Sequence, residues 1–390
     1  MQNFKRTSSA IYCLLTAAFL TACGGGGGGG DGTTPVAGTS TLGTGGGTSV
    51  SQGVITGFGS VFVNGIEFST GGATVKIDDN PGLESDLKIG MVVTVRGTAD
   101  DAARTGSAVQ IEARDILEGT IEPGGVDAVN KTITVMGQTV RIEDNVTRLN
   151  DDDTVKTFAT AAFAVGDRVE VHGFADDQGG LRATRVAKKA SGEFEIKGFV
   201  TSIGAGTFGL SLTPGGAVAL TVTGTLPAGA IVGSLVEVKA GAAPLAGTLT
   251  ATAVQLEDRL GAAGEKVEVE GIVTSGTVDS FLVNGQRVLT NSATLFEGGL
   301  RTDFAVGAKL EAEGPMDANG AIAATKISFR GNIKIEANAS GVSASGLTVL
   351  GKSVAINAFT RVDNGPLADG QHVEVRAFAD RDGNLIATRV

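Results

Sequence analysis

The chain has 390 residues, with 31 basic and 42 acidic side chains and a net charge of −11. Because an acidic surface is repelled by phosphate backbones, the composition argues against a nucleic-acid-binding protein. The sequence has no Trp, and its only Tyr is Tyr12, so the aromatic platforms that stack bases or sugars would have to come from its 17 Phe. The 60 Gly residues favour a fold with many tight turns.

Residues 1–22 have the layout of a secretory signal peptide. Lys5 and Arg6 precede an apolar run from Ala10 to Leu20, and small residues follow. The run is about half the roughly 20 residues that a membrane-spanning helix needs. Removal of this segment would leave 29 basic and 42 acidic side chains.

The end of the signal resembles the lipobox of bacterial lipoproteins, in the segment Leu20-Thr21-Ala22-Cys23. The resemblance implies cleavage before Cys23, a diacylglycerol on its thiol and a further acyl chain, such as palmitate, on the new amino terminus. Several acyl chains give stable anchoring. Gly24 follows the cysteine instead of Asp, which resembles the outer-membrane class of these proteins. We therefore expect a protein lipid-anchored in the cell outer membrane, facing the periplasm or the cell surface.

A Gly-, Ser- and Thr-rich segment follows the anchor. Residues 23–52 begin, after the cysteine, with seven glycines, Gly24 to Gly30. Such a composition cannot pack a core and behaves as a flexible spacer. We interpret residues 23–52 as a tether.

The rest of the chain repeats two phrases. The first is a Gly, two variable residues and an alternating strand, and it occurs five times, at Gly90–Gly97, Gly166–Gly173, Gly233–Ala240, Gly307–Gly314 and Gly370–Ala377. The second occurs at Leu181–Val186, Leu249–Val254, Ile322–Ile327 and Leu385–Val390, with a weaker copy at Ala108–Ile111. Asp- and Gly-rich turns separate the two phrases, so each pair predicts a hairpin.

Each repeat also opens with strands, most clearly from Lys266 to Thr274. The pair Asn284-Gly285 then joins two short apolar runs, and Asn64-Gly65 does the same in the first repeat. Asn-Gly between apolar runs is the strongest short hairpin signal. The segment from Ala293 to Phe304 could form one short helix between the third and fourth strands.

Five strands with a connector after the third are the plan of the OB-fold, a small Greek-key barrel. We therefore predict an all-β array of about five OB-like units. Open β-sandwich units are the alternative. The predicted boundaries are 53–115, 116–192, 193–265, 266–330 and 331–390.

The two phrases and the lipobox together resemble exported bacterial proteins with tandem copies of a β-barrel module catalogued as domain of unknown function 5666. The resemblance covers most of residues 53–390. The third repeat departs most, because it lacks Asn-Gly and is rich in Ala, Gly and Pro. The family name assigns no activity, so the resemblance implies architecture only.

Few residues offer catalytic chemistry. His172 and His372 occupy outward strand positions in different repeats, and we expect both to be solvated. A Ser-His-Asp or Cys-His nucleophile would need one of them. The acidic turns are the candidate ion sites, and Asp380, Asp382 and Asn384 offer oxygen ligands of the kind that calcium prefers. The simpler interpretation is a hairpin turn, which we also give to Asp176–Gly179. Asp151–Asp153 reads as a solvated loop.

Repetition without a recognisable catalytic motif predicts a non-enzymatic binding or scaffold lipoprotein of the outer membrane. The alternatives are a passive stalk or spacer of the cell envelope and a hydrolase that uses paired carboxylates. We expect no cofactor and no resident metal. The expected partners are the membrane, through the anchor, and an envelope protein, but no nucleic acid; a small-molecule ligand is left open.

Overall fold

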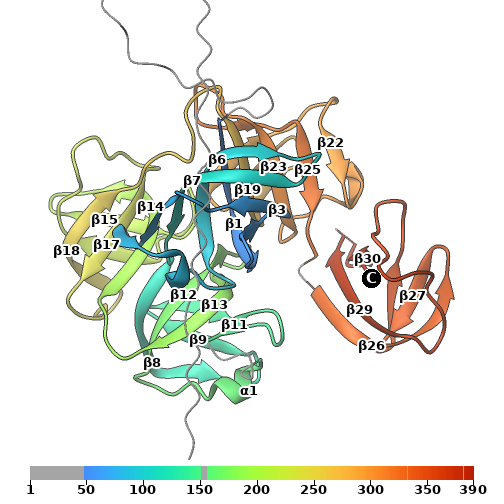
Figure 1. The fold of residues 1–390 in the computed structure, drawn as a ribbon. Coiled ribbons are helices and arrows are strands. Elements are labelled where there is room, and N and C mark those ends of the chain that lie inside the picture. Colours follow the sequence, from blue (N-terminus) through green and yellow to red (C-terminus); the bar gives the residue numbers. More distant parts are fainter. Residues whose placement is uncertain (1–47, 151–155, 332, 381) are drawn as a thin grey trace, which may run out of the picture. The chain divides into compact units, whose positions relative to one another are not determined.

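The structure is a computed structural model that describes residues 48–150, 156–331, 333–380 and 382–390 (Figure 1). The predicted signal, Cys23, most of the tether and Asp151–Asp153 lie outside the described residues. Within them, no helix is both long and apolar enough to cross a membrane. The first strand begins at Thr48, so the last five residues of the predicted tether belong to the folded part.

The described chain folds into five successive units, which we call barrels 1 to 5. Barrel 1 contains β1 (Thr48–Gly57), β2 (Val61–Val63), β3 (Ile66–Ser69), β4 (Thr74–Ile77), β5 (Asn80–Gly82), β6 (Val92–Asp100) and β7 (Thr105–Ala113). Barrel 2 contains β8 (Leu117–Asp127), β9 (Thr132–Val135), β10 (Gln138–Arg141), β11 (Arg148–Leu149), β12 (Arg168–Ala175) and β13 (Leu181–Lys189). Barrel 3 contains β14 (Phe194–Ile203), β15 (Thr207–Ser211), β16 (Leu220–Thr223), β17 (Leu235–Ala240) and β18 (Thr248–Leu256).

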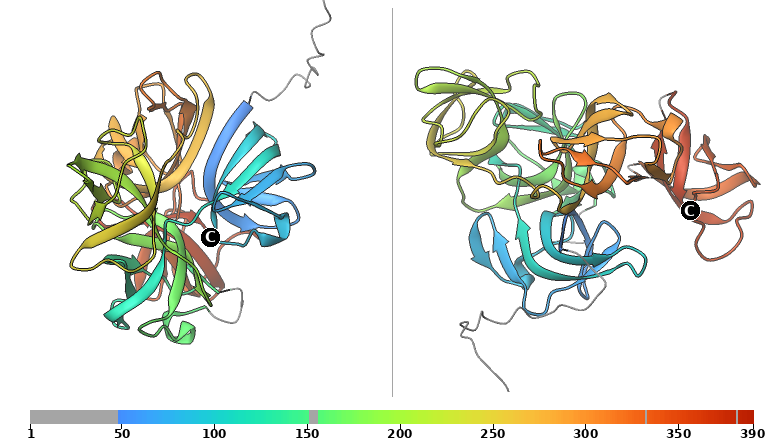
Figure 2. Two further views of the ribbon diagram at one scale, coloured as in Figure 1. Left: turned by 90° about the vertical axis from the view of Figure 1, so that its left-hand side faces the viewer. Right: turned by 90° about the horizontal axis from the view of Figure 1, so that it is seen from above.

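The last two barrels have the same plan. Barrel 4 contains β19 (Lys266–Thr277), β20 (Ser280–Val283), β21 (Gln286–Leu289), β22 (Leu295–Glu297), β23 (Lys309–Pro315), β24 (Ile322–Ala323) and β25 (Lys326–Phe329). Barrel 5 contains β26 (Ile333–Ser343), β27 (Gly346–Val349), β28 (Lys352–Ala355), β29 (His372–Ala379) and β30 (Leu385–Arg389), and it is red in Figures 1 and 2.

In each barrel the strand pairings close a ring. Barrel 5 shows it most simply, in the order β26-β27-β28-β30-β29 and back to β26. All these pairings are antiparallel except that of β28 with β30. Barrels 1 to 3 form the same ring, in which the parallel pairs are β3 with β7, β10 with β13 and β16 with β18. In barrel 4 the last strand is interrupted, so that β24 pairs with β21 and β25 pairs with β23. The prediction of small five-stranded OB-like barrels is confirmed, and the sandwich alternative is wrong.

The Asn-Gly pairs make the tight turns that the sequence predicts. Asn284 and Gly285 have φ angles of 47° and 74°, and Asn64 and Gly65 have 55° and 81°. Two consecutive left-handed residues form the turn whose twist matches a hairpin. Barrel 3 lacks the pair, and a longer loop joins β15 to β16 instead.

The connector from Ala293 to Phe304 differs from the prediction of a short helix. It contains β22, which pairs in parallel with β25, and a 3-10 turn of three residues, Arg301–Asp303. Gly298 has a φ of 74° and precedes Gly299, and this backbone conformation is incompatible with a continuous helix. The four-residue α1 (Phe158–Ala161), in barrel 2, is the α-helix of the described part of the chain.

The barrel cores follow the alternation of the strands. In barrel 5, Leu347, Val349, Val354 and Val375 point inward and are buried. Burying one such side chain contributes roughly 1.5–3 kcal/mol. Barrels 2 and 3 share one continuous apolar cluster, and Val50 of barrel 1 packs in the cluster of barrel 4.

First strands also pair between barrels. β1 runs parallel to β19, with Ser49 opposite Lys266 and Gln52 opposite Val269. β8 runs antiparallel to β14, with Leu117 opposite Ile196. Hydrogen bonds between strands therefore join barrel 1 to barrel 4 and barrel 2 to barrel 3.

Candidate functional site: a buried charge cluster

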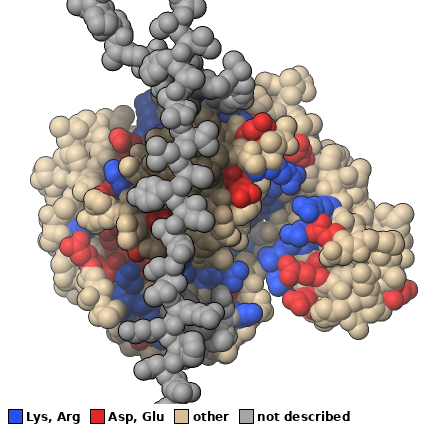
Figure 3. Space-filling view, in the orientation of Figure 1, with Lys and Arg blue, Asp and Glu red and all other residues tan. Residues whose placement is uncertain are grey.

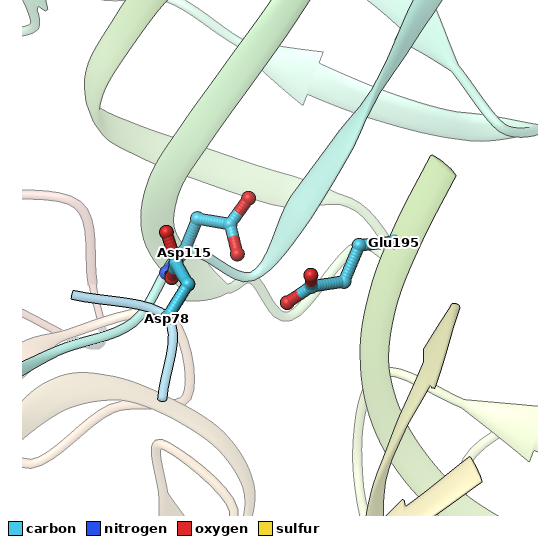
Figure 4. Close-up of side chains that lie close together, drawn as sticks. All are labelled: Asp78, Asp115 and Glu195. Carbon is cyan, nitrogen blue, oxygen red and sulfur yellow. The ribbon is translucent and has the colours of Figure 1, made fainter. Parts of the chain in front are cut away.

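Three carboxylates from separate segments meet beside the first strand of barrel 3 (Figure 4). Asp78 lies in the turn between β4 and β5, Asp115 lies in the link from β7 to β8, and Glu195 lies on β14. One oxygen from each lies within 4.8 Å of the others. Three carboxylates at this spacing are a ligand set that a hard cation such as calcium accepts.

The ammonium group of Lys197 already contacts two of these carboxylates, those of Asp115 and Glu195, and also the carboxylate of Glu237. Its Nζ lies 2.5 Å from Oε1 of Glu195, 3.0 Å from Oε2 of Glu237 and 3.3 Å from Oδ1 of Asp115. Lys239 Nζ adds contacts of 3.3 Å to Glu195 and 3.2 Å to Glu237. The two lysines supply the positive charge that a bound metal would otherwise bring.

The strand register explains this arrangement. Glu195 and Lys197 leave the same face of β14, because they are two residues apart. On β17, Lys239 lies opposite Glu195 and Glu237 lies opposite Lys197. Each acid therefore faces a base across the sheet, which is the favourable arrangement for cross-strand pairs.

Burial and the neighbouring charges shift the pKa values of the cluster's side chains in opposite directions. Burial raises the pKa of Asp115 well above its usual range, although the positive charge of Lys197 opposes the rise. Burial by itself would also raise the pKa of Glu195, but the attraction of Lys197 outweighs it and lowers that pKa. Burial would lower the pKa of Lys197, but Asp115, Glu195 and Glu237 raise it well above its usual value. Lys197 therefore stays charged inside the protein.

Sequence reasoning missed this cluster, because its members are far apart in the chain. Asp78, Asp115 and Glu195 come from three segments that only the contact of barrels 1, 2 and 3 brings together. The available signal was charge at consecutive outward positions of paired strands, Glu195 and Lys197 on one and Glu237 and Lys239 on the other.

His172 is not solvated, contrary to the prediction. It is 1% exposed, its Nδ1 lies 3.1 Å from the carbonyl oxygen of Arg114, and its Nε2 lies 3.2 Å from Oε1 of Glu170. The outward face of β12 is covered by other segments, which the repeat pattern alone does not reveal. His372, by contrast, has a side chain that is 65% exposed, as expected.

The calcium candidates form a hairpin turn. Oδ1 of Asp380 accepts hydrogen bonds from the backbone N–H groups of Asp382, at 2.9 Å, and Asn384, at 2.8 Å. Asp176 accepts from Gln178 and Gly180 in the same way. In turns of this kind the Asp carboxylate accepts hydrogen bonds from the backbone N–H groups of the residues that follow it. Asp380 and Asn384 lie close together, but they hydrogen-bond to each other within the turn.

The fold and its repetition define the class of the protein, a tandem array of small OB-like β-barrels. The chain belongs to the family described as Domain of unknown function (DUF5666), which matches residues 50–112, 118–187, 270–328 and 334–390. Residues 193–265 lie outside these four ranges, yet barrel 3 has the same ring of strands. The prediction of tandem copies of this family is confirmed. No curated protein matches the chain.

One solved structure that the chain resembles is described as a multidomain protein with nucleic acid binding domains from Streptococcus pneumoniae. The identity is 14%, and the match covers 50% of this chain and 72% of that chain with a TM-score of 0.17. Our expectation that nucleic acid is not a partner conflicts with that description, and we withdraw the exclusion. At this TM-score the likeness carries no argument about function.

Proposed function

We propose that this protein is a non-enzymatic binding or scaffold lipoprotein, anchored to the cell outer membrane through acylated Cys23. The observation that carries the proposal is the direct joining of barrels, in which β1 pairs with β19 and β8 pairs with β14. Barrels joined in this way combine several similar surfaces in one chain. Such a combination suits multivalent binding, in which each contact raises the effective concentration of the next.

The charge cluster supports this proposal over the hydrolase alternative. A glycosidase-type pair needs one carboxyl group that donates a proton and one that stays ionised, both facing a substrate. Asp115 is 2% exposed and Glu195 is 5% exposed, and Lys197 lies between them. The cluster therefore acts as an internal ion network that holds barrel 3 to the link before barrel 2.

The anchor is tested by labelling cells with an alkyne analogue of palmitate and separating inner and outer membranes on a density gradient. The full-length chain should carry the label and sediment with the outer membrane. The Cys23→Ser variant should carry no label and leave that fraction. Labelling that persists in the Cys23→Ser variant would refute the assignment of the anchor.

The scaffold role is tested by crosslinking in cells, purification of the full-length chain and mass spectrometry, with Cys23→Ser as the matched control. A stoichiometric partner that is recovered with the wild-type chain and lost with the variant supports the proposal. Recovery of no partner above the control level contradicts it and favours a passive spacer.

A further inference from the structure

The first strand of barrel 5 has an open edge where the other barrels have a partner. In barrels 1 to 4 the amino-terminal half of the first strand pairs with a later strand of its own barrel, which is β6, β12, β17 or β23, and also with the first strand of another barrel. In barrel 5, residues 333–338 of β26 pair with β29, and the pairing with β27 starts only at Ala339. Among the described residues, no strand takes the other edge of 333–338. An open strand edge is a template for another strand.

The side chains of β26 show the same difference. Ile335 pairs with Val375, as Leu117 pairs with Val171 in barrel 2 and Ile196 with Val238 in barrel 3. Leu117 and Ile196 are 0% exposed, and the equivalent Ile335 is partly exposed. Ile335 packs partly buried against the core of barrel 5, and within the described part of the chain it lacks the strand of a neighbouring barrel that lies beside Leu117 and Ile196.

The outward positions of β26 and β29 carry charges, as they do in barrel 3. These positions hold Lys334, Glu336, Glu374 and Arg376 in barrel 5 and Glu195, Lys197, Glu237 and Lys239 in barrel 3. The side chains of the barrel 5 set are 16%, 51%, 44% and 35% exposed, in the order listed, whereas those of the barrel 3 set are 6%, 10%, 0% and 21% exposed. Figure 3 shows basic and acidic side chains side by side on barrel 5. Glu336, Glu374 and Arg376 are thus more exposed than the side chains of the barrel 3 set, and Lys334 forms ion pairs with Glu336 and Glu374 within barrel 5.

The pairing of barrels 2 and 3 shows which partner would fit. Leu117 lies opposite Ile196, and these are equivalent residues of two barrels, so the two antiparallel strands are related by an approximate twofold axis. Lys197 N–H donates to the carbonyl oxygen of Ile116, at 3.0 Å, one step away from this central pair. A second copy of β26 placed in the same way would centre on Ile335. It would set Lys334 of each copy opposite Glu336 of the other.

The backbone of β26 offers the matching groups. Ala339 N–H donates to Gln371 O in the direction of β29, at 2.8 Å. Because bonded groups alternate along an antiparallel pair, the N–H and C=O groups of Lys334 and Glu336 point to the open edge. These are the residues that would face each other in the twofold arrangement, so hydrogen bonds and opposite charges would coincide.

We propose that two copies of this chain form a symmetric dimer through antiparallel pairing of β26, centred on Ile335, with Lys334 of one copy opposite Glu336 of the other. Closed twofold pairing is the commonest form of self-association, and it removes the open edge. The dimer is independent of the proposed membrane anchor. A monomeric protein would leave the anchor proposal standing, and an unlabelled protein would leave the dimer proposal standing.

The test uses the full-length chain in detergent, with light scattering or sedimentation to measure the dimer. Lys334→Glu and Glu336→Lys each place like charges opposite one another, and each should raise the dissociation constant by roughly tenfold or more. An equimolar mixture of the two variants restores opposite charges at both contacts, and it should form a heterodimer about as tightly as the wild type pairs. Lys352→Glu, an equal charge change at an exposed position of barrel 5, should leave the dimer unchanged.

The mixture separates a lost interface from lost folding, because two unfolded variants would not rescue each other. A monomeric wild-type protein at every concentration reached would overturn the proposal. A dimer that both single variants leave intact would do so too, since it would use another surface. Crosslinks from 333–338 to a different protein in place of a second copy would also overturn it.

Discussion

Nζ of Lys197 lies 2.5 Å from Oε1 of Glu195, and the two side chains share one face of β14. Only 8% of Lys197 and 5% of Glu195 are exposed. The same ammonium contacts Asp115, which lies in the link between barrels 1 and 2. One buried lysine therefore ties barrel 3 to a segment about 80 residues earlier in the chain.

We predict that Lys197→Met destabilises the protein by roughly 3–5 kcal/mol, the usual cost of removing one partner from a buried ion pair. The loss arises because Glu195 and Glu237 would remain buried with only Lys239 to offset their charge, and because Asp115 would lose its contact with the ammonium group. Urea unfolding followed by circular dichroism measures the change.

The matched control is Lys76→Met, at an exposed position of β4, which should change the free energy of unfolding by no more than about 0.5 kcal/mol. Equal effects of the two substitutions would mean that the cluster around Lys197 does not stabilise the fold.

The sequence predicts the barrels better than their contacts. Period-two alternation identifies the side of a strand that faces the core, and it located β12, β17 and β29 through the repeated Gly phrase. The alternation does not show whether the outward face of the strand meets water or a neighbouring barrel. For this reason the alternation predicts a solvated His172, whereas the structure buries it. The Gly-, Ser- and Thr-rich composition of residues 23–52 places Thr48–Gln52 in the predicted tether, whereas in the structure these residues begin β1 and part of them is buried.

The contact of barrel 3 with the turn of barrel 4 gives a second prediction. A Cβ added at Gly285 would lie 2.2 Å from Cζ of Phe199, so Phe199 would have to move. Gly65 holds the equivalent turn position in barrel 1, has a φ of 81°, and has no atom within 4 Å of an added Cβ.

Gly65→Ala should therefore cost only the backbone strain of a left-handed alanine, roughly 1–2 kcal/mol. Gly285→Ala should cost that strain and a further loss from the displaced Phe199, and the same unfolding measurement compares the two. If Gly285→Ala is no more costly than Gly65→Ala, Phe199 does not pack tightly on this turn.

The third prediction concerns Glu118, which lies on β8 opposite Glu195. Burial and the nearby charge of Glu170 raise the pKa of Glu118 to about 7, against the attraction of Lys189 and Arg168. The model-peptide pKa of a glutamate is about 4.3, so between that pH and about 7 the unfolded chain ionises this group before the folded chain does. The unfolded state then binds fewer protons, and the contribution of Glu118 to stability falls as the pH rises through this window.

Replacing the glutamate removes this dependence. Glu118→Gln should be more stable than the wild type at pH 8, and the difference should shrink as the pH falls from 7 toward 4, where both states of the wild type become protonated at this position. Thermal unfolding of both proteins across this range measures the difference, and the low-pH end serves as the internal control. A difference that is constant with pH would mean that Glu118 titrates alike in the folded and unfolded chain, and that its closeness to Glu170 and Glu195 has no electrostatic cost.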